Sequence, residues 1–131
     1  ERLQPTVFIT IAPPAVVGLS LLQLGAPVLV GWACWGMALF ALGWSATQLP
    51  RIQALPFGLP HWGMSFPLAA LAALTLRLAT PGGLLAVLGP VLLALASLVI
   101  LVLALATVRG LRQGTLLVPE PVATITPAAG A

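Results

Sequence analysis

The segment LLAVLGPVLLALASLVILVLALATV, residues 84–108, decides the fold class of this chain. It carries no ionisable side chain, and Ser97 is its one serine. An α-helix of about 25 residues rises about 37 Å, which exceeds the roughly 30 Å hydrocarbon core of a bilayer. The apolar residues surround the helix on all sides, so the segment predicts an outer, lipid-facing transmembrane helix. Pro90 predicts a kink within it.

Three further apolar segments, each of about 20 residues, precede this one. Backbone hydrogen bonds must be closed within each span in lipid, so each is predicted to be helical. Turn-forming Pro and Gly residues separate the segments, and Pro-rich sequence without periodicity follows residue 112. The sequence therefore predicts an all-α integral membrane protein with four transmembrane helices in residues 1–112 and a disordered cytoplasmic tail in residues 113–131. The predicted spans are residues 5–24, 28–47, 61–79 and 84–108.

The composition indicates a protein that is embedded in the lipid bilayer. Hydrophobic residues make up 60% of the chain and charged residues only 5%, against about 25% in soluble domains. Such a chain is neither an ordinary soluble enzyme nor a nucleic-acid binder. One Cys and one His exclude a disulfide framework and a Cys- or His-based metal site, and we expect no cofactor. The chain starts with Glu1 rather than Met, so we expect it to be a piece of a longer protein.

The arginines predict the orientation. Arg2, Arg51, Arg109 and Arg112 fall on one side of a four-span arrangement, and Arg77 falls on the other. The positive-inside rule places the first side, with both termini, in the cytoplasm of a plasma membrane, which for a bacterium is the inner membrane. Arg77 lies near the end of its span. It either extends to the membrane interface or attracts an anion.

The first span, PTVFITIAPPAVVGLSLLQL, differs from the lipid-facing type. Thr6, Thr10, Pro14 and Gly18 are four residues apart and predict a polar or small helical face. Pro13 and Pro14 each lack an N–H and leave backbone carbonyls four residues earlier without a helical donor. Two interpretations stay open: the prolines kink a packed helix, or the carbonyls face a wet cavity.

The third span, HWGMSFPLAALAALTLRLA, has the most informative pattern. Trp62, Phe66, Ala69, Ala73 and Arg77 recur at steps of three or four and predict one helical face. Pro67 follows Phe66 directly and breaks the helical hydrogen bonding there. Phe66 therefore either packs against a neighbour or blocks a path lined by small residues. The opposite sector is apolar and consists of Leu68, Leu71, Leu74 and Leu78.

The positions of the acidic residues limit which solutes a transmembrane path through this chain could carry. Glu1 and Glu120 both lie outside the spans, which argues against a proton-coupled exporter of the small four-helix type. A transmembrane path lined by hydroxyls and bare carbonyls, with arginines near its ends, suits a neutral or anionic solute better than a cation. The alternative is a structural membrane subunit that has no solute pathway of its own.

Two segments resemble a known family. They are PTVFITIAPPAVVGLSLL, residues 5–22, and LPFGLPHWGMSFPLAALAALTLRLA, residues 55–79. Together they are similar to the C-terminal part of the tellurite-resistance/dicarboxylate transporter family, which includes plant guard-cell slow anion channels, fungal sulfite exporters and malate permeases. Order and spacing agree over roughly the first 110 residues. The sequence departs at His61, where relatives often have a second Trp before the one that aligns with Trp62.

The resemblance implies helices seven to ten of a ten-helix bundle with five-fold pseudo-symmetry, in which the odd-numbered helices surround a pore. Spans one and three would then be inner helices, and Phe66 would match the family's pore-blocking phenylalanine. It further implies a voltage-independent, non-enzymatic path for a small anion such as a C4-dicarboxylate, tellurite, sulfite or an inorganic anion. The implied partners are the lipid bilayer, the remaining N-terminal helices and two further copies in a homotrimer. The candidate pore-lining residues are Thr10, Pro13, Pro14, Ser65, Pro67, Ala69 and Ala73, with Arg77 for anion attraction.

Overall fold

The computed structural model describes residues 4–116 of the 131-residue chain, and this part is helical without a strand. Four of its helical segments are long and apolar enough to cross a membrane: Thr6–Gln23, Val28–Ala46, Leu59–Leu78 and Leu84–Arg112. This confirms the predicted all-α membrane fold class. Most of the predicted tail, residues 117–131, lies outside the described residues. The elements are η1 (Gln4–Ile11), α1 (Ala12–Gln23), α2 (Val28–Ala46), α3 (Leu49–Gln53), η2 (Leu59–Met64), α4 (Ser65–Leu78) and α5 (Leu84–Arg112).

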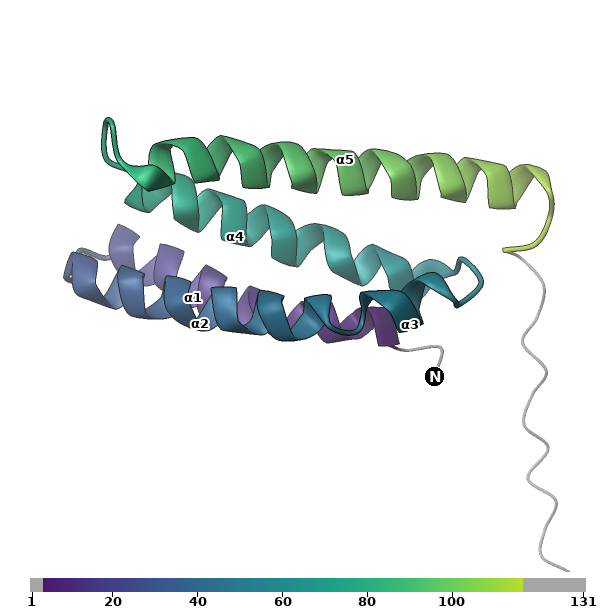
Figure 1. Cartoon of the computed structure of the whole chain (residues 1–131), viewed down its shortest axis with the longest axis horizontal. Helices are drawn as coiled ribbons and strands as arrows, with labels where there is room; N and C mark the ends of the chain where they lie inside the picture. The colour runs from purple at the N-terminus through teal and green to yellow at the C-terminus, as the bar shows by residue number, and fades with distance from the viewer. Residues whose placement is uncertain (1–3, 117–131) are drawn as a thin grey trace, which may run out of the picture.

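The spans run alternately back and forth (Figure 1). α1 packs against both α2 and α4, whereas α5 packs against α4 and η2. One end of the bundle holds the α1–α2 and α4–α5 turns, and the other holds α3 and the end of α5. The tight turns depend on Gly25 and Gly82, which adopt φ values of 86° and 75°. Glycine adopts this left-handed region without the steric cost that a Cβ imposes.

Spans one and three share an interrupted construction that spans two and four lack. Each begins as a 3-10 helix, η1 or η2, and continues as an α-helix. The change falls just before Pro13 and Pro14 in the first span and just before Pro67 in the third. These prolines therefore stand in the first turn of α1 and α4, where a missing N–H is tolerated. α5, by contrast, continues as one helix through Pro90.

The best-packed interior lies where α1, α2 and α4 meet. Leu71 and Leu74 of α4 are fully buried there, together with Ile11 and Ala15 from the first span. Gly18 allows the close approach, because an ideal Cβ on it would lie only 2.7 Å from the Cβ of Cys34 and 3.1 Å from Leu74. α5 is the least buried span, as the apolar sequence around its whole circumference predicts.

Two hydrogen bonds of the same kind join neighbouring spans. The indole N–H of Trp35 in α2 donates to the hydroxyl of Thr75 in α4 at 2.9 Å. The indole N–H of Trp62 in η2 donates to the hydroxyl of Thr107 in α5 at 3.0 Å. Each threonine in turn donates to the carbonyl four residues earlier, at 2.8 Å. The pairs fix α2 and α5 against the third span without a charged group.

The Trp35–Thr75 pair is expected to contribute a measurable coupling energy. Thr75 is fully buried, so Thr75→Val removes the acceptor and leaves the indole N–H unpaired. We expect a loss of about 1 kcal/mol, within the range measured for hydrogen bonds between transmembrane helices. A double-mutant cycle with Trp35→Phe, read as free energy of unfolding in bicelles, measures the coupling. Strictly additive losses would show that the bond does not stabilise the bundle.

Candidate functional site

α4 presents one face that no helix of the described chain covers. Phe66 is 63% exposed on this face, and Ala73 and Arg77 are also exposed, with Ala69 half-buried. The residues recur at the helical period, as the sequence predicted, and they turn away from α1 and α2. The opposite face is packed into the interior. Its buried members are Pro67, Leu68, Ala70, Leu71, Ala72, Leu74, Thr75 and Leu78.

Phe66 projects from the junction between η2 and α4. The residues beside it are held inward, because the side chain of Pro67 is fully buried and Ser65 is half-buried, with its hydroxyl donating to the carbonyl of Trp62 at 2.8 Å. With rises of 2.0 and 1.5 Å per residue, Phe66 lies about 13 Å along a third span of about 33 Å. An aromatic ring is thus held well within the membrane, on a face whose next two residues are alanines.

The 3-10 geometry of η2 changes one sequence-based prediction. Trp62 was expected to share the face of Phe66, four residues later. A 3-10 helix has three residues per turn, so side chains before Ser65 leave the α-helical register. Trp62 is instead directed to α5, where its indole binds Thr107. Phe66 is therefore the first aromatic residue on the open face of α4.

The first span also has an open side, although it differs from the predicted one. Thr10 and Pro13 are exposed and Pro14 is half-buried. Gly18, predicted on the same face, is instead buried in the contact with Cys34. Gly18 follows Pro14 by four residues in the same α-helix, but each step of four turns about 40° around the axis, so the later positions drift into the contact with α2.

The two open sides lie at similar depth. η1 packs against η2, and an ideal Cβ on Gly63 would lie 3.6 Å from both Ile9 and the Cα of Thr6. The two spans start from the same end of the bundle (Figure 1), so Thr10 and Phe66 each follow this contact within one turn. The structure thus brings the first-span hydroxyl and the third-span ring to one level. Thr10 itself donates to the carbonyl of Val7 at 2.7 Å, and Ser45 donates to the same carbonyl at 3.4 Å.

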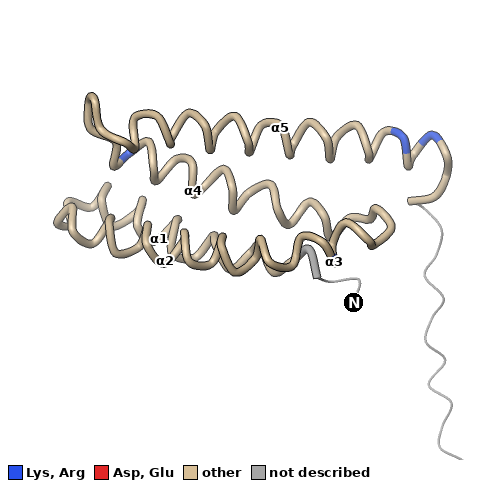
Figure 2. Tube along the Cα trace, viewed as in Figure 1, with Lys and Arg blue, Asp and Glu red and all other residues tan. Residues whose placement is uncertain are grey.

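Within residues 4–116, charged side chains stand only near the helix ends. Arg51, Arg77, Arg109 and Arg112 stand in the last turns of α3, α4 and α5. Figure 2 shows the cations near the end of α4 and, at the opposite end of the bundle, near the end of α5. Residues 4–116 include no Asp or Glu, and no group of His, Cys, Asp or Glu suited to a metal ion occurs in this described part. The open faces are therefore uncharged until Arg77.

These features define a multi-pass membrane protein whose proline-interrupted spans carry uncharged faces that this part of the chain leaves open. The sequence model of the voltage-dependent anion channel family matches residues 1–108. The chain belongs to this family, which confirms the resemblance seen in its sequence. No match was found among curated proteins or among solved structures.

Proposed function

We propose that the protein conducts small anions across the membrane through a pore lined by the open faces of spans one and three. The observation that carries the proposal is the exposed ring of Phe66 at the head of a small-residue face on a proline-interrupted span. In this pore Phe66 is the steric gate. Thr10, Pro13, Ala69 and Ala73 line the path, while Pro14, Ser65 and Pro67 shape the helix breaks beside it.

The electrostatics of the described residues support an anion as solute. Along the part of the path formed by residues 4–116, an anion passes hydroxyls and backbone and meets no carboxylate. Arg109 and Arg112 stand at the end of α5 and raise the local anion concentration there. C4-dicarboxylates, tellurite, sulfite and inorganic anions all fit this chemistry.

The rest of the pore requires further helices. We propose that N-terminal helices of the same protein complete the ring around the open faces, with the present spans as helices seven to ten, and that three copies assemble. We also propose a plasma membrane location, the inner membrane in a bacterium, with the Arg51 and Arg109 end in the cytoplasm according to the positive-inside rule.

Ion selectivity tests the proposal. Full-length protein in liposomes is expected to release chloride or malate down a gradient while the membrane stays impermeable to potassium. The reversal potential in planar bilayers then follows the anion gradient. Protein-dependent potassium flux, or no flux of any listed anion, would contradict the proposal. The alternative, a structural subunit without a path, predicts no flux.

The positions of the arginines also predict that the conductance depends only weakly on voltage. Steep gating requires charged side chains that move within the membrane field. The four described arginines all stand in last helical turns, so residues 4–116 supply no charged side chain in the middle of a span. We therefore propose that conductance changes little with voltage, although the family's description names voltage dependence. Current–voltage curves of the full-length protein measure this directly.

Arg77→Gln is expected to leave anion flux within about twofold of wild type. Arg77 is exposed in the last turn of α4, where a long side chain extends to the interface. Flux measured at low and at high salt separates the two roles of this residue. A tenfold loss at low salt that disappears at high salt would show that Arg77 attracts the anion, because screening removes that attraction.

A further inference from the structure

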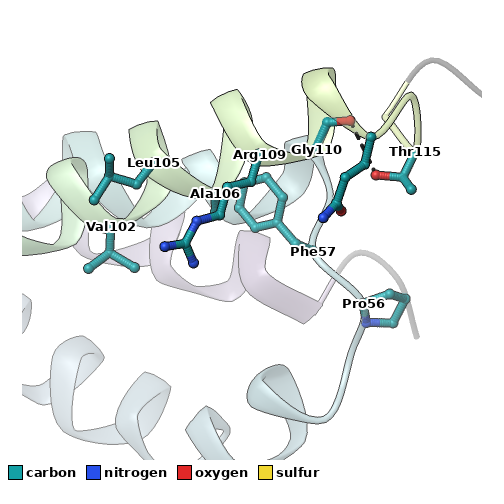
Figure 3. Close-up of a pocket in the computed structure, with 9 residues that line it drawn as sticks. Pro56, Phe57, Val102, Leu105, Ala106, Arg109, Gly110 and Thr115 are labelled. Carbon is teal, nitrogen blue, oxygen red and sulfur yellow. Dashed lines mark hydrogen bonds between the residues drawn. The ribbon is translucent and has the colours of Figure 1, made fainter.

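A pocket separate from the open faces lies at the end of α5. It opens between the last turns of α5 and the segment just before η2 (Figure 3). Pro56 and Phe57 form one wall, and α5 with the turn after it forms the other. The lining residues are Pro56, Phe57, Val102, Leu105, Ala106, Arg109, Gly110, Gln113 and Thr115.

The pocket has an apolar part and a polar part, in an order that follows the membrane normal. Val102 and Leu105 lie toward the middle of the span, and Arg109, Gln113 and Thr115 lie at its end. α5 has 29 residues and is about 43 Å long, which exceeds the roughly 30 Å hydrocarbon core. Arg109 therefore stands near headgroup level, about 10 Å along the axis from Val102.

Arg109 has no acidic partner among the described residues. Residues 4–116 contain no carboxylate, so the counterion of Arg109 comes from outside this part of the chain. The amide of Gln113 lines the same pocket, and the hydroxyl of Thr115 is held nearby by a 3.3 Å bond to the carbonyl of Gly110. The Thr115 hydroxyl donates to that carbonyl, so Gln113 supplies the neutral N–H donors of the pocket. A guanidinium with a side-chain amide in the same pocket suits the oxygens of a phosphate.

We propose that this pocket binds an anionic phospholipid. Its phosphate pairs with Arg109, and one acyl chain lies along Val102 and Leu105 against Phe57. A free phosphate would use the polar part alone and leave the apolar wall unoccupied. The site does not depend on the proposed pore, because none of its residues lies on the open faces of α1 and α4.

Native mass spectrometry of the full-length protein tests this binding. The protein is titrated with phosphatidylglycerol and, separately, with phosphatidylcholine. Arg109→Gln is expected to weaken phosphatidylglycerol binding about tenfold or more, the range of a lost charge-assisted hydrogen bond. Arg112→Gln is the matched control, because Arg112 stands in the same last turn outside the pocket. Arg112→Gln is expected to weaken phosphatidylglycerol binding by no more than about fivefold, the general effect of one surface charge.

The outcomes distinguish a lipid site at Arg109 from general surface-charge binding and from a free-phosphate site. Equal losses in the two variants would overturn the proposal, since surface charge alone would then explain the binding. Unchanged phosphatidylglycerol affinity in both variants would also overturn the proposal and would show that other helices cover the pocket. Inorganic phosphate and glycerol phosphate are added as water-soluble competitors. Displacement of the lipid by either at low millimolar concentration would identify a free-phosphate site instead and would also overturn it.

Discussion

Phe66→Ala is expected to raise anion flux through the full-length protein by about tenfold or more. The ring projects from the open face of α4, 63% exposed, and the next two residues along that face, Ala69 and Ala73, are small. In the proposed pore, truncation to a methyl removes an apolar constriction that would exclude both water and hydrated ions. A barrier lowered by about 1.4 kcal/mol already gives a tenfold increase. Efflux of a radiolabelled or fluorescence-detected anion from liposomes measures the change.

Phe40→Ala is the matched control for this experiment. Phe40 is also a phenylalanine with a largely exposed ring, at 78%, but it belongs to α2, which has no 3-10 interruption. We expect its flux to stay within about twofold of wild type. An equal rise in both variants would point to a general loosening of the bundle, and an unchanged Phe66→Ala flux would remove Phe66 from the gate.

Gly18→Ala is expected to destabilise the bundle, although alanine is the better helix former by roughly 0.5–1 kcal/mol. The new methyl would lie 2.7 Å from the Cβ of Cys34, a short and inflexible neighbour, and 3.1 Å from Leu74. α1 must therefore move away from α2 and α4. We expect a net loss of about 1–3 kcal/mol, the usual range for overpacking. Unfolding of the full-length protein in bicelles gives the free energy.

Gly36→Ala provides the comparison. Gly36 lies within α2, and nothing stands within 4 Å of the position a Cβ would take. The substitution is expected to leave stability unchanged or to raise it by up to about 1 kcal/mol. If Gly18→Ala and Gly36→Ala behaved alike, the three helices would not be packed as closely around Gly18 as the structure has them.

The membrane class and the open face of α4 were accessible from sequence because both depend on simple periodicity. The uninterrupted apolar run at 84–108 needs no tertiary information, and the steps from Phe66 to Ala73 and Arg77 lie within one regular α-helix. The separation of this face from the buried leucines follows from the same helical period.

Side-chain directions near the 3-10 segments, and contacts between helices, could not be predicted from the sequence. Prolines indicated breaks near Pro13 and Pro67, but not the change of helix type that turns Trp62 toward α5. The spacing of four likewise did not indicate that Gly18 lies in a helix contact. The Trp35–Thr75 and Trp62–Thr107 pairs join residues 40 and 45 positions apart, and no local pattern encodes such contacts. The pocket at Arg109 likewise combines two segments that are distant in sequence.

Water accessibility at Ala73 tests the central claim, that the open faces line an anion path rather than dry contacts. The full-length protein carries Cys34→Ala, which removes the buried native thiol of this part of the chain, together with Ala73→Cys. Any other cysteine of the protein is also replaced. We predict that a membrane-impermeant, charged thiol reagent modifies the new side chain and blocks anion flux. Leu93→Cys on the exposed, apolar side of α5 is expected to stay unmodified.

An Ala73→Cys protein that resists the reagent in the Phe66→Ala background, where the gate is absent, would contradict the account. It would mean that neighbouring helices cover this face without water, as a purely structural subunit requires. Modification together with loss of flux is expected if the open faces of α1 and α4 line the pore.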